Sequence, residues 1–331
     1  MKLFKFQQEG LGIDLGTSNS IISDENGKII INEPSVVAID INNYDIVAVG
    51  TEAKSMIGKT PDNIVAISPI ENGVIADFES TVSMLSYFIK KARPNFSVFQ
   101  PEVCVSVSAS LTDVERRSVE DLALNSGARS VKLVEENIAS LKGLGVDVDE
   151  PTGHIVLNIG AGTIEASVIS LGGIVTSYCI KSGGEDIDQE IKQILKKKFG
   201  VNIGISTAEA IKFKIATLNS DRENNTMIVG GTDVISTMPK SVEIRAKDIT
   251  PAIVPIADMC IEALRKVLEK TPPDIANDII AEGIYIVGGV SLIDYIHEYI
   301  TNVLGIKVLK VDSPMDCTGI GIGKFLKKGD K

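Results

Sequence analysis

The sequence predicts an α/β protein made of two related halves, and two observations carry that prediction. In residues 12–20 and again in residues 155–165, an apolar strand ends at a glycine, small polar residues follow, and β-branched residues resume. Strand-like and helix-like segments alternate after each of these stretches. With 331 residues, of which 44% are hydrophobic, the chain is long enough to bury a large core and to form about two domains.

The first stretch, GIDLGTSNS at 12–20, predicts a tight hairpin. Gly16 leaves room at the turn, and Thr17, Ser18 and Asn19 offer backbone N–H groups and short polar side chains to a phosphate. Asp14 precedes the turn, at a position suited to Mg²⁺. We therefore expect a phosphate-binding hairpin.

The second stretch, IVLNIGAGTIE at 155–165, repeats this form, and a further strand is expected from Ala166 to Ser170. A glycine-tipped hairpin alone is more often plain structure than a binding site. The resemblance between the two stretches is the stronger observation. It suggests two halves that both contact one nucleotide.

Composition and charge exclude several classes of protein. The net charge of −11 argues against general binding of nucleic acid, which normally requires a basic surface. Four well-separated cysteines and two isolated histidines, His154 and His297, form no metal-ligand or hydrolase pattern. Since we find neither an apolar span nor a signal-peptide core, we expect a cytoplasmic protein.

The first half is expected to contain alternating strands and helices. Asp77 is the predicted N-cap of a helix to Ala92, and Thr112 or Asp113 is the predicted cap of the next helix. Gly58 is expected to end a short helix. The other predicted elements are strands at 29–31, 36–41, 47–49, 103–107 and 131–134, and helices at 52–57 and 138–144.

An acidic segment, 145–153, is the expected crossing to the second half. The proline at 251 marks the predicted start of a long amphipathic helix to Lys270, and Gly288 to Ser291 is expected to begin a helix whose N–H groups face an anion. The other predicted elements are helices at 186–199 and 207–216, short strands within 227–249, and strands at 284–287 and 308–311.

Two segments carry apolar residues in settings that leave two interpretations open. Residues 1–9 include Leu3, Phe4 and Phe6 among lysines. This pattern suits either an edge strand or a short segment that contacts an anionic membrane surface. The loop at 94–101 carries Phe96, Val98 and Phe99 between prolines. These side chains either turn inward or form an exposed patch for a partner or a membrane.

Several motifs together resemble the superfamily of actin, sugar kinases and heat-shock chaperones. In chain order they are GIDLGT at 12–17, Glu135-Glu136, IGxGT at 159–163 and Gly288-Gly289. The segments NEPSVVAI at 32–39, GVIADF at 73–78 and DVERR at 113–117 are similar to the MreB family of bacterial actin-like cell-shape proteins. The match extends nearly end to end.

This resemblance implies an actin-like ATPase fold. Its two halves would be ribonuclease H-like mixed sheets flanked by helices, with a nucleotide cleft between them and two smaller subdomains. The implied division is a first half at 1–145 with a subdomain at about 32–75, a second half at 146–314 with a subdomain at about 182–246, and a segment at 315–331 that returns to the first half.

The resemblance also implies roles for individual residues. Glu136 corresponds to the glutamate that orients the attacking water, and Thr163 to the hydroxyl that helps to place it. Glu209 and Lys212 correspond to a segment that contacts adenosine. A surface salt bridge would explain the presence of these two residues equally well. The implied ligands of ATP are Gly16, Thr17, Ser18, Asn19, Gly160, Ala161, Gly162, Glu209, Lys212, Gly288, Gly289, Val290 and Ser291, and those of Mg²⁺, through water, are Asp14 and Asn158.

The sequence departs from the family pattern at four positions. Asn158 replaces an aspartate at the head of the second hairpin, which leaves fewer anionic oxygens near the metal. Ala161 replaces a glycine, Ile164 a threonine, and Asn137 a proline after the paired glutamates. We therefore expect ATP to bind and to be hydrolysed slowly.

The leading hypothesis is an ATPase that forms filaments, with antiparallel paired protofilaments on the inner membrane face and possible co-assembly with actin-like paralogues. The membrane candidates are Phe96, Val98 and Phe99, helped by terminal lysines. A structural paralogue with little turnover is the alternative. A small-molecule kinase or a chaperone-type ATPase fits less well, because we identify neither a catalytic aspartate with sugar-contacting residues nor a substrate-binding domain.

Overall fold

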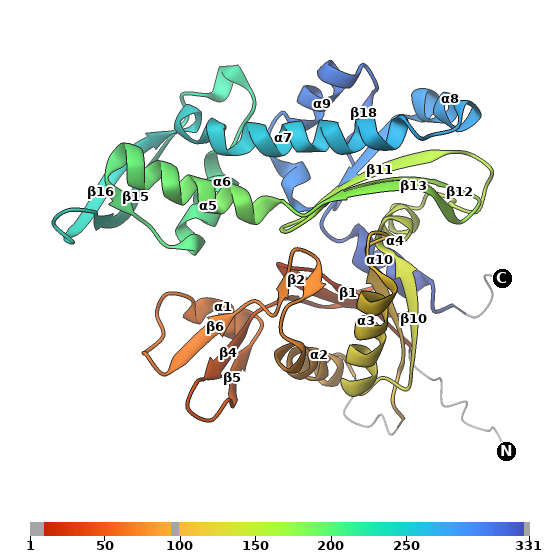
Figure 1. Ribbon diagram of the computed structural model, residues 1–331, viewed down its shortest axis with the longest axis horizontal. Coiled ribbons are helices and arrows are strands. Elements are labelled where there is room, and N and C mark those ends of the chain that lie inside the picture. Colours follow the sequence, from red (N-terminus) through yellow and green to blue (C-terminus); the bar gives the residue numbers. More distant parts are fainter. Residues whose placement is uncertain (1–9, 94–98, 328–331) are drawn as a thin grey trace. The chain divides into compact units, whose positions relative to one another are not determined.

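The computed structural model of the chain describes residues 10–93 and 99–327 (Figure 1). These residues divide into two compact units. The first comprises the described parts of Met1–Glu150, Leu171–Ile174 and Met315–Lys331, and the second comprises Pro151–Ser170 and Val175–Pro314. The chain therefore leaves the first unit after Glu150, contributes Leu171–Ile174 to it while building the second, and returns at Met315.

Each unit contains a five-stranded mixed sheet, and the two sheets have the same topology. The strand orders are β3-β2-β1-β9-β10 and β13-β12-β11-β17-β18. In each sheet an antiparallel hairpin, β1–β2 or β11–β12, is followed by two parallel neighbours. The strands are β1 Gly10–Leu15, β2 Asn19–Ser23, β3 Ile29–Pro34, β9 Glu102–Val107, β10 Ser130–Glu135, β11 His154–Ile159, β12 Ile164–Ser170, β13 Gly173–Ile180, β17 Ile284–Val287 and β18 Val308–Leu309.

Apolar side chains hold helices against both sheets. In the first unit Phe88 and Leu122 are fully buried beside Ile13, and in the second unit the buried stripe of α7 packs on β11 and β12 (Figure 1). The α-helices are α1 Thr51–Met56, α2 Phe78–Ala92, α3 Asp113–Asn125, α4 Glu136–Gly143, α5 Gly184–Ile194, α6 Ile205–Ile215, α7 Ala246–Leu268, α8 Pro273–Glu282, α9 Ile296–Leu304 and α10 Cys317–Lys324.

Smaller sheets extend each unit. The first unit carries the sheet β5-β4-β6 and the pair β7–β8, and the second carries β14-β15-β16. Their bounds are β4 Val37–Asp40, β5 Ile46–Val49, β6 Ile64–Ile67, β7 Ile70–Glu71, β8 Val74–Ile75, β14 Val201–Asn202, β15 Thr226–Asp233 and β16 Pro239–Arg245.

The predicted helix caps are confirmed. The Asp77 side chain accepts a hydrogen bond from Ser80 N, and Thr112 forms a capping box with Glu115. The predicted start of the long helix at Pro251 was wrong, because α7 begins at Ala246. Pro251 and Pro255 lie on the exposed side of α7, where water can bond the carbonyls that lack a partner, while the opposite side is buried.

Helix α10 packs closely on α4 in the first unit. A Cβ at Gly143 would lie 1.9 Å from the Cys317 carbonyl oxygen, and one at Gly321 would lie 1.8 Å from that of Ala139. Such distances are too short for any side chain, so glycine allows the two backbones to touch. The last described helix is thereby joined to elements that precede it by more than 170 residues.

Candidate functional site

The first hairpin, β1–β2, has the predicted glycine tip. Gly16 N donates to Asn19 O at 3.2 Å, and a Cβ at Gly16 would lie 2.7 Å from that same oxygen. The carbonyl of Gly16 accepts from Ser35 Oγ at 2.7 Å. The Thr17 hydroxyl accepts from Gly73 N at 3.1 Å. The tip is therefore fixed by hydrogen bonds from the Ser35 side chain and the Gly73 backbone, both outside the hairpin.

Asp14 lies on β1 just before this tip and is half-buried. Burial raises the pKa of its carboxyl to about 6, although a hydrogen bond from Ser106 Oγ at 2.6 Å acts in the opposite direction. Ser106 occupies the carboxyl end of β9, the parallel neighbour of β1. A poorly solvated carboxylate of this kind is stabilised in its charged form by a nearby cation.

The donor set suits Mg²⁺ better than a metal that needs several protein ligands. Within residues 10–93 and 99–327, no group of three or more His, Cys, Asp or Glu side chains is placed to hold a metal ion. Mg²⁺ usually keeps several waters and takes one or two carboxylates together with substrate phosphates. One half-buried aspartate beside a glycine-tipped turn meets the protein part of that requirement.

Glu136 is the first residue of α4 and is half-buried. Its carbonyl accepts from Ser140 Oγ at 2.9 Å, and Glu135, the preceding residue, pairs with Arg116 at 3.1 Å. Asn137, which replaces the family proline, is fully buried. The backbone around Glu136 is thus held by contacts on both sides.

The second hairpin, β11–β12, closes in the same way as the first. Gly160 N donates to Thr163 O at 2.9 Å, as Gly16 does to Asn19. Helix α5 begins against this tip, where Gly184 N donates to Gly160 O at 3.0 Å and Glu185 N to Ala161 O at 2.9 Å. The first turn of α5 therefore supports the hairpin through backbone hydrogen bonds.

Asn158 and Gly288 meet beside the second hairpin. Asn158 is buried on β11 and pairs with Val287 on β17, and a Cβ at Gly288 would lie 2.7 Å from its Oδ1. Gly288 has φ +86°, and its Cβ would lie 2.3 Å from the Ile159 carbonyl oxygen. Only glycine fits this position without strain.

The segment after Gly288 is a short 3₁₀ turn, Gly289–Leu292, and not the longer helix start that the sequence suggested. Ser291 is buried, and its Oγ donates to Gly288 O at 2.6 Å. Val290 is also buried and lies close to Gly184. A Cβ added at Gly184 would lie 3.0 Å from Val290 Cγ2. The Gly288 turn and the start of α5 are therefore neighbours.

Lys212 lies on α6 and reaches α5. Its Nζ lies 2.7 Å from Asp188 Oδ2 and donates to Gly184 O at 2.8 Å, and both charged side chains are at most 10% exposed. Glu209, one turn earlier, is half-buried. The pairing is with Asp188, on another helix, and it is buried rather than on the surface.

Sequence reasoning missed the residues that support the site. Ser106 had a usable signal, because it ends a strand whose parallel neighbour carries Asp14. Ser35 and Asp188 had none, since neither lies on a strand whose parallel neighbour carries its partner. In the second unit the structure gathers Asn158, the second hairpin tip, Lys212 and the Gly288 turn around Gly184.

Of the membrane candidates, Phe96 and Val98 lie outside the described residues, as do Leu3, Phe4 and Phe6. Phe99 is described and is 58% exposed, and the Arg93 guanidinium donates to its carbonyl oxygen. None of the helices in the described part of the chain combines the length and the apolar character that crossing a bilayer requires.

The family described as MreB/Mbl protein matches residues 8–331. The chain belongs to the MreB/Mbl family. The cell shape-determining protein Mbl of Bacillus subtilis strain 168 is 39% identical over 321 residues, which cover 97% of this chain and 96% of Mbl. The cell shape-determining protein MreB of Escherichia coli K12 is 38% identical over 325 residues, covering 97% and 94%.

Solved structures confirm the actin-like fold. MreB5 of Spiroplasma citri bound to AMPPNP has a TM-score of 0.91 and 28% identity, covering 97% of this chain and 96% of MreB5. The same protein bound to ADP gives the same values. The MamK double helical filament has a TM-score of 0.80 at 20% identity, covering 96% and 98%, and supports the fold alone.

Proposed function

We propose that this chain is an ATP-binding cytoskeletal protein that forms filaments, hydrolyses ATP slowly and acts in cell-shape determination. The observation that carries the proposal is the match, over 97% of the chain, to MreB5 crystallised with AMPPNP and with ADP. The cell-shape role is supported by the names of the relatives, Mbl and MreB. The two hairpin tips are closed by the same kind of backbone hydrogen bond, and this shared geometry supports binding of a phosphate chain.

The phosphate contacts are assigned to the backbone of the tips. In the first hairpin the Thr17 hydroxyl already accepts from Gly73 N, and Asn19 Nδ2 donates to Asn32 Oδ1 at 2.8 Å. The backbone N–H groups of Gly16 and Gly160 close the hairpins, so those of Thr17 to Asn19, and of Ala161 and Gly162, are the proposed donors to phosphate oxygens. Gly16 and Gly160 permit this close approach because they lack a side chain.

Mg²⁺ would be held by Asp14 and, on the other hairpin, by Asn158, in both cases through water. When bound, the ion neutralises charge on the phosphates. Asp14 supplies the anionic oxygen, and Ser106 holds that carboxylate in one orientation. Asn158 supplies only a neutral amide oxygen, which weakens the electrostatic field at the phosphates.

Hydrolysis requires an attacking water that is aligned with the γ-phosphate and relieved of a proton. We assign the orientation of that water to Glu136 and Thr163. The first turn of α4 fixes the backbone of Glu136, whereas the buried Asn137 replaces the more rigid proline of the family. Together with Asn158 and Ala161, this replacement is the basis for proposing slow turnover.

The adenosine contacts are assigned to the Gly288 turn, Gly288 to Ser291, and to Glu209. Lys212 is less suited to a direct contact, because its ammonium group is already bonded to Asp188 and to the Gly184 carbonyl. Its proposed role is to hold α5 and α6 together beside the second hairpin. Glu209 remains a candidate ligand on the same helix.

Filaments are proposed to consist of antiparallel protofilament pairs at the inner face of the membrane, with possible co-assembly with actin-like paralogues. The exposed ring of Phe99 supports a membrane contact. Each lysine near an anionic surface contributes about 1 kcal/mol, so a few can offset the net charge of −11. A weakly hydrolysing structural paralogue that acts through co-assembly is the second candidate, favoured by Asn158.

Three measurements on purified protein test the proposal. Pelleting and electron microscopy with Mg·ATP are expected to show filaments, and anionic liposomes are expected to recruit them. Phosphate release is expected to be slow but measurable. Filaments without turnover would favour the structural paralogue, and a monomer that binds no nucleotide would contradict the proposed function.

A further inference from the structure

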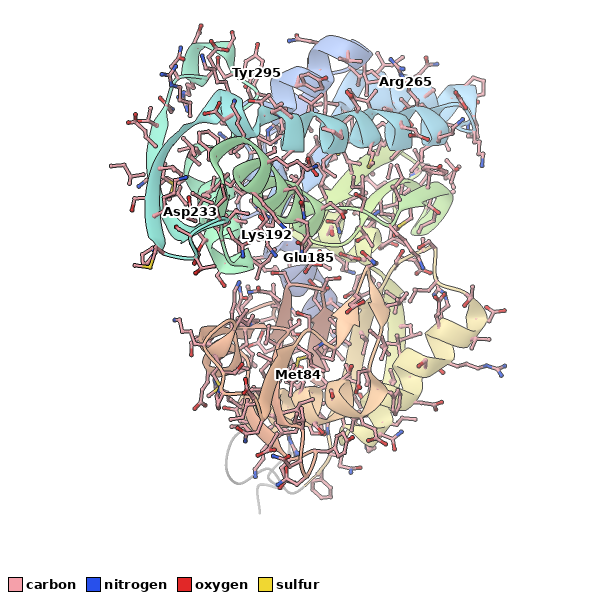
Figure 2. All side chains as sticks on the ribbon, turned by 60° about the vertical axis from the view of Figure 1, so that its left-hand side comes forward. Met84, Glu185, Lys192, Asp233, Arg265 and Tyr295 are labelled. Carbon is pink, nitrogen blue, oxygen red and sulfur yellow. The ribbon has the colours of Figure 1, made fainter. Side chains whose placement is uncertain are left out.

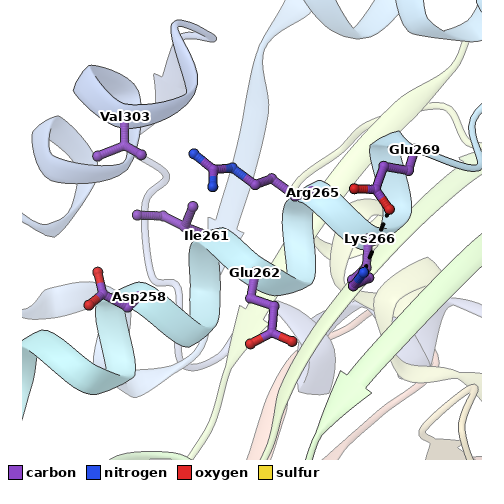
Figure 3. Close-up of a pocket in the computed structure, with 7 residues that line it drawn as sticks. All are labelled: Asp258, Ile261, Glu262, Arg265, Lys266, Glu269 and Val303. Carbon is purple, nitrogen blue, oxygen red and sulfur yellow. Dashed lines mark ion pairs between the residues drawn. The ribbon is translucent and has the colours of Figure 1, made fainter.

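The charged groups around α7 in the second unit lie at the surface. Arg265 is exposed (Figure 2), and it lines a surface pocket of about 480 Å³ in which five of the seven lining side chains are charged (Figure 3). Lys266 Nζ and Glu269 Oε2 lie 3.7 Å apart there. Exposed ion pairs contribute little free energy, because water solvates both partners. Buried hydroxyl groups in the first unit are different, because they must bond to protein atoms.

Two buried hydroxyl groups connect α10 to the first turn of α4. Ser140 Oγ donates to the carbonyl oxygen of Glu136 at 2.9 Å, and Ser140 Oγ and Thr318 Oγ1 lie 2.8 Å apart. Ser140 is fully buried and Thr318 is 5% exposed. A serine hydroxyl has one proton, and a carbonyl oxygen can only accept it, so Thr318 is the donor to Ser140. Burial raises the pKa of the neighbouring Cys317 thiol to about 12, so no thiolate competes for the Ser140 proton.

Helix α10, which carries Thr318, is fixed on two sides. On the α4 side the two backbones touch at glycines, as described above. On the sheet side Ser23 Oγ donates to the Gly319 carbonyl at 2.6 Å, and a Cβ at Gly12 would lie 2.5 Å from Gly323 N. The Thr318 hydroxyl therefore cannot move far unless α10 separates from its neighbours.

The first turn of α4 depends on support from outside the helix. Among the described residues its N-cap, Glu135, makes no side-chain hydrogen bond to the helix, and the helix is only 8 residues long. Short helices owe most of their stability to tertiary packing. A proline at position 137 would fix its own φ, whereas Asn137 does not restrict this dihedral in the same way. The two hydroxyl groups are thus among the contacts that set where Glu136 lies.

We propose that Thr318 positions Glu136 for ATP hydrolysis and acts through the hydroxyl of Ser140. The inference rests on the proposed function, in which Glu136 orients the attacking water. Thr318 and Ser140 are positioning residues, because their hydroxyl groups bond each other and the Glu136 carbonyl. They set the angle at which the first turn of α4 presents the Glu136 side chain. A small misplacement of such a group slows the reaction without weakening the binding of substrate.

The first test removes the Thr318 hydroxyl and then restores it. Thr318→Val keeps nearly the same volume but leaves the Ser140 oxygen without a donor, so the Ser140 hydroxyl can rotate away from the Glu136 carbonyl. With Mg·ATP, kcat for phosphate release is expected to fall about tenfold while KM stays within about twofold. Thr318→Ser keeps the donor and is expected to restore most of the rate. Pelleting of the same samples shows whether filament assembly is unchanged.

The second test compares two matched serines of the first unit. Ser126 is buried like Ser140, and its Oγ bonds the carbonyl four residues earlier, Leu122 O, at 2.7 Å and Val82 O on α2 at 3.3 Å. Ser140→Ala and Ser126→Ala are therefore expected to lower the unfolding temperature by similar amounts. Only Ser140→Ala is expected to slow phosphate release, by about tenfold. This pair also decides the question if Thr318→Val does not fold.

The outcomes separate this inference from the proposed function. If the unchanged chain releases phosphate and Thr318→Val releases it equally fast, the positioning role is wrong while the proposed function stands. Equal slowing in Ser126→Ala, no recovery in Thr318→Ser, or a rate that falls only in proportion to lost filaments would also overturn the role. If the unchanged chain releases no more phosphate than Glu136→Gln, the proposed hydrolysis fails and the role of Thr318 fails with it.

Discussion

Lys212 Nζ and Asp188 Oδ2 lie 2.7 Å apart in a pair whose two side chains are at most 10% exposed. The same Nζ donates to the carbonyl of Gly184, whose N–H in turn donates to Gly160 O. One ammonium group thus connects α6, the start of α5 and the second hairpin tip. This ion pair stabilises the elements that carry the candidate site.

Lys212→Met is expected to lower the free energy of unfolding by about 3–5 kcal/mol, because it leaves the Asp188 carboxylate buried without its cation. Chemical denaturation monitored by circular dichroism measures the change. Lys214→Met, on the exposed side of the same helix, is the control and should change stability by less than about 0.5 kcal/mol. Unchanged stability together with weaker ATP binding would instead assign Lys212 to the nucleotide.

Gly288→Ala is expected to destabilise the protein more than Gly305→Ala. Both glycines have positive φ, but Gly305 (φ +70°, ψ 9°) is left-handed helical, where alanine costs about 1 kcal/mol, whereas Gly288 (φ +86°, ψ 163°) lies in a region that only glycine adopts readily, where alanine costs about 1–3 kcal/mol. Only at Gly288 would the new Cβ also meet a carbonyl, whereas Gly305 has open space around it. Thermal unfolding of the two variants measures the difference, and equal losses would mean that the close approach at Gly288 relaxes easily.

Asn158→Asp is expected to raise phosphate release by about tenfold, equivalent to about 1.4 kcal/mol of the barrier, because it restores a carboxylate near the metal. Asn158 pairs across the hairpin with the buried Glu165, so the new charge faces a like charge. The variant should therefore unfold at a lower temperature in EDTA and recover with Mg·ATP. A steady-state assay with no increase would remove Asn158 as the cause of slow turnover.

Thiol labelling is expected to be confined to Cys179 in the folded protein. Burial raises the pKa of the Cys104 and Cys317 thiols to about 12, and that of Cys260 also rises. A raised thiol pKa means less thiolate at a given pH, so these three cysteines should react slowly at pH 7 and still slowly at pH 9. Cys179 is only half-buried.

Mass spectrometry after brief maleimide treatment locates the labels. One label per folded chain is expected, and four after denaturation. Rapid labelling of Cys317 in the folded state would show that α10 separates from α4 far more often than their close packing implies.

Most of the fold class was predictable from the sequence, because glycine tips and apolar periodicity are local signals. Both hairpins and the caps Asp77 and Thr112 are confirmed. The start of α7 was not predictable in the same way. Proline is normally a helix boundary, and only tertiary packing, which puts Pro251 and Pro255 on the exposed side of a half-buried helix, allows the helix to continue through them.

The candidate site was predictable as a set of motifs but not as a set of contacts. The motifs supplied Asp14 and the two glycine tips. Ser106, Ser35 and Asp188 hold these groups through hydrogen bonds between residues that are distant in sequence. The buried partner of Lys212 was unpredictable for the same reason, since Asp188 lies 24 residues away on another helix.

The glycine-lined packing of α10 on α4 has a consequence for synthesis of the protein. The first unit contains the described parts of Met315–Lys331 as well as those of Met1–Glu150, and most of the residues between these ranges form the second unit. Because a ribosome delivers the chain from its N-terminus, the earlier-made part must wait for about 160 further residues before α10 arrives. A nascent chain therefore lacks a finished first unit until α10 has been made.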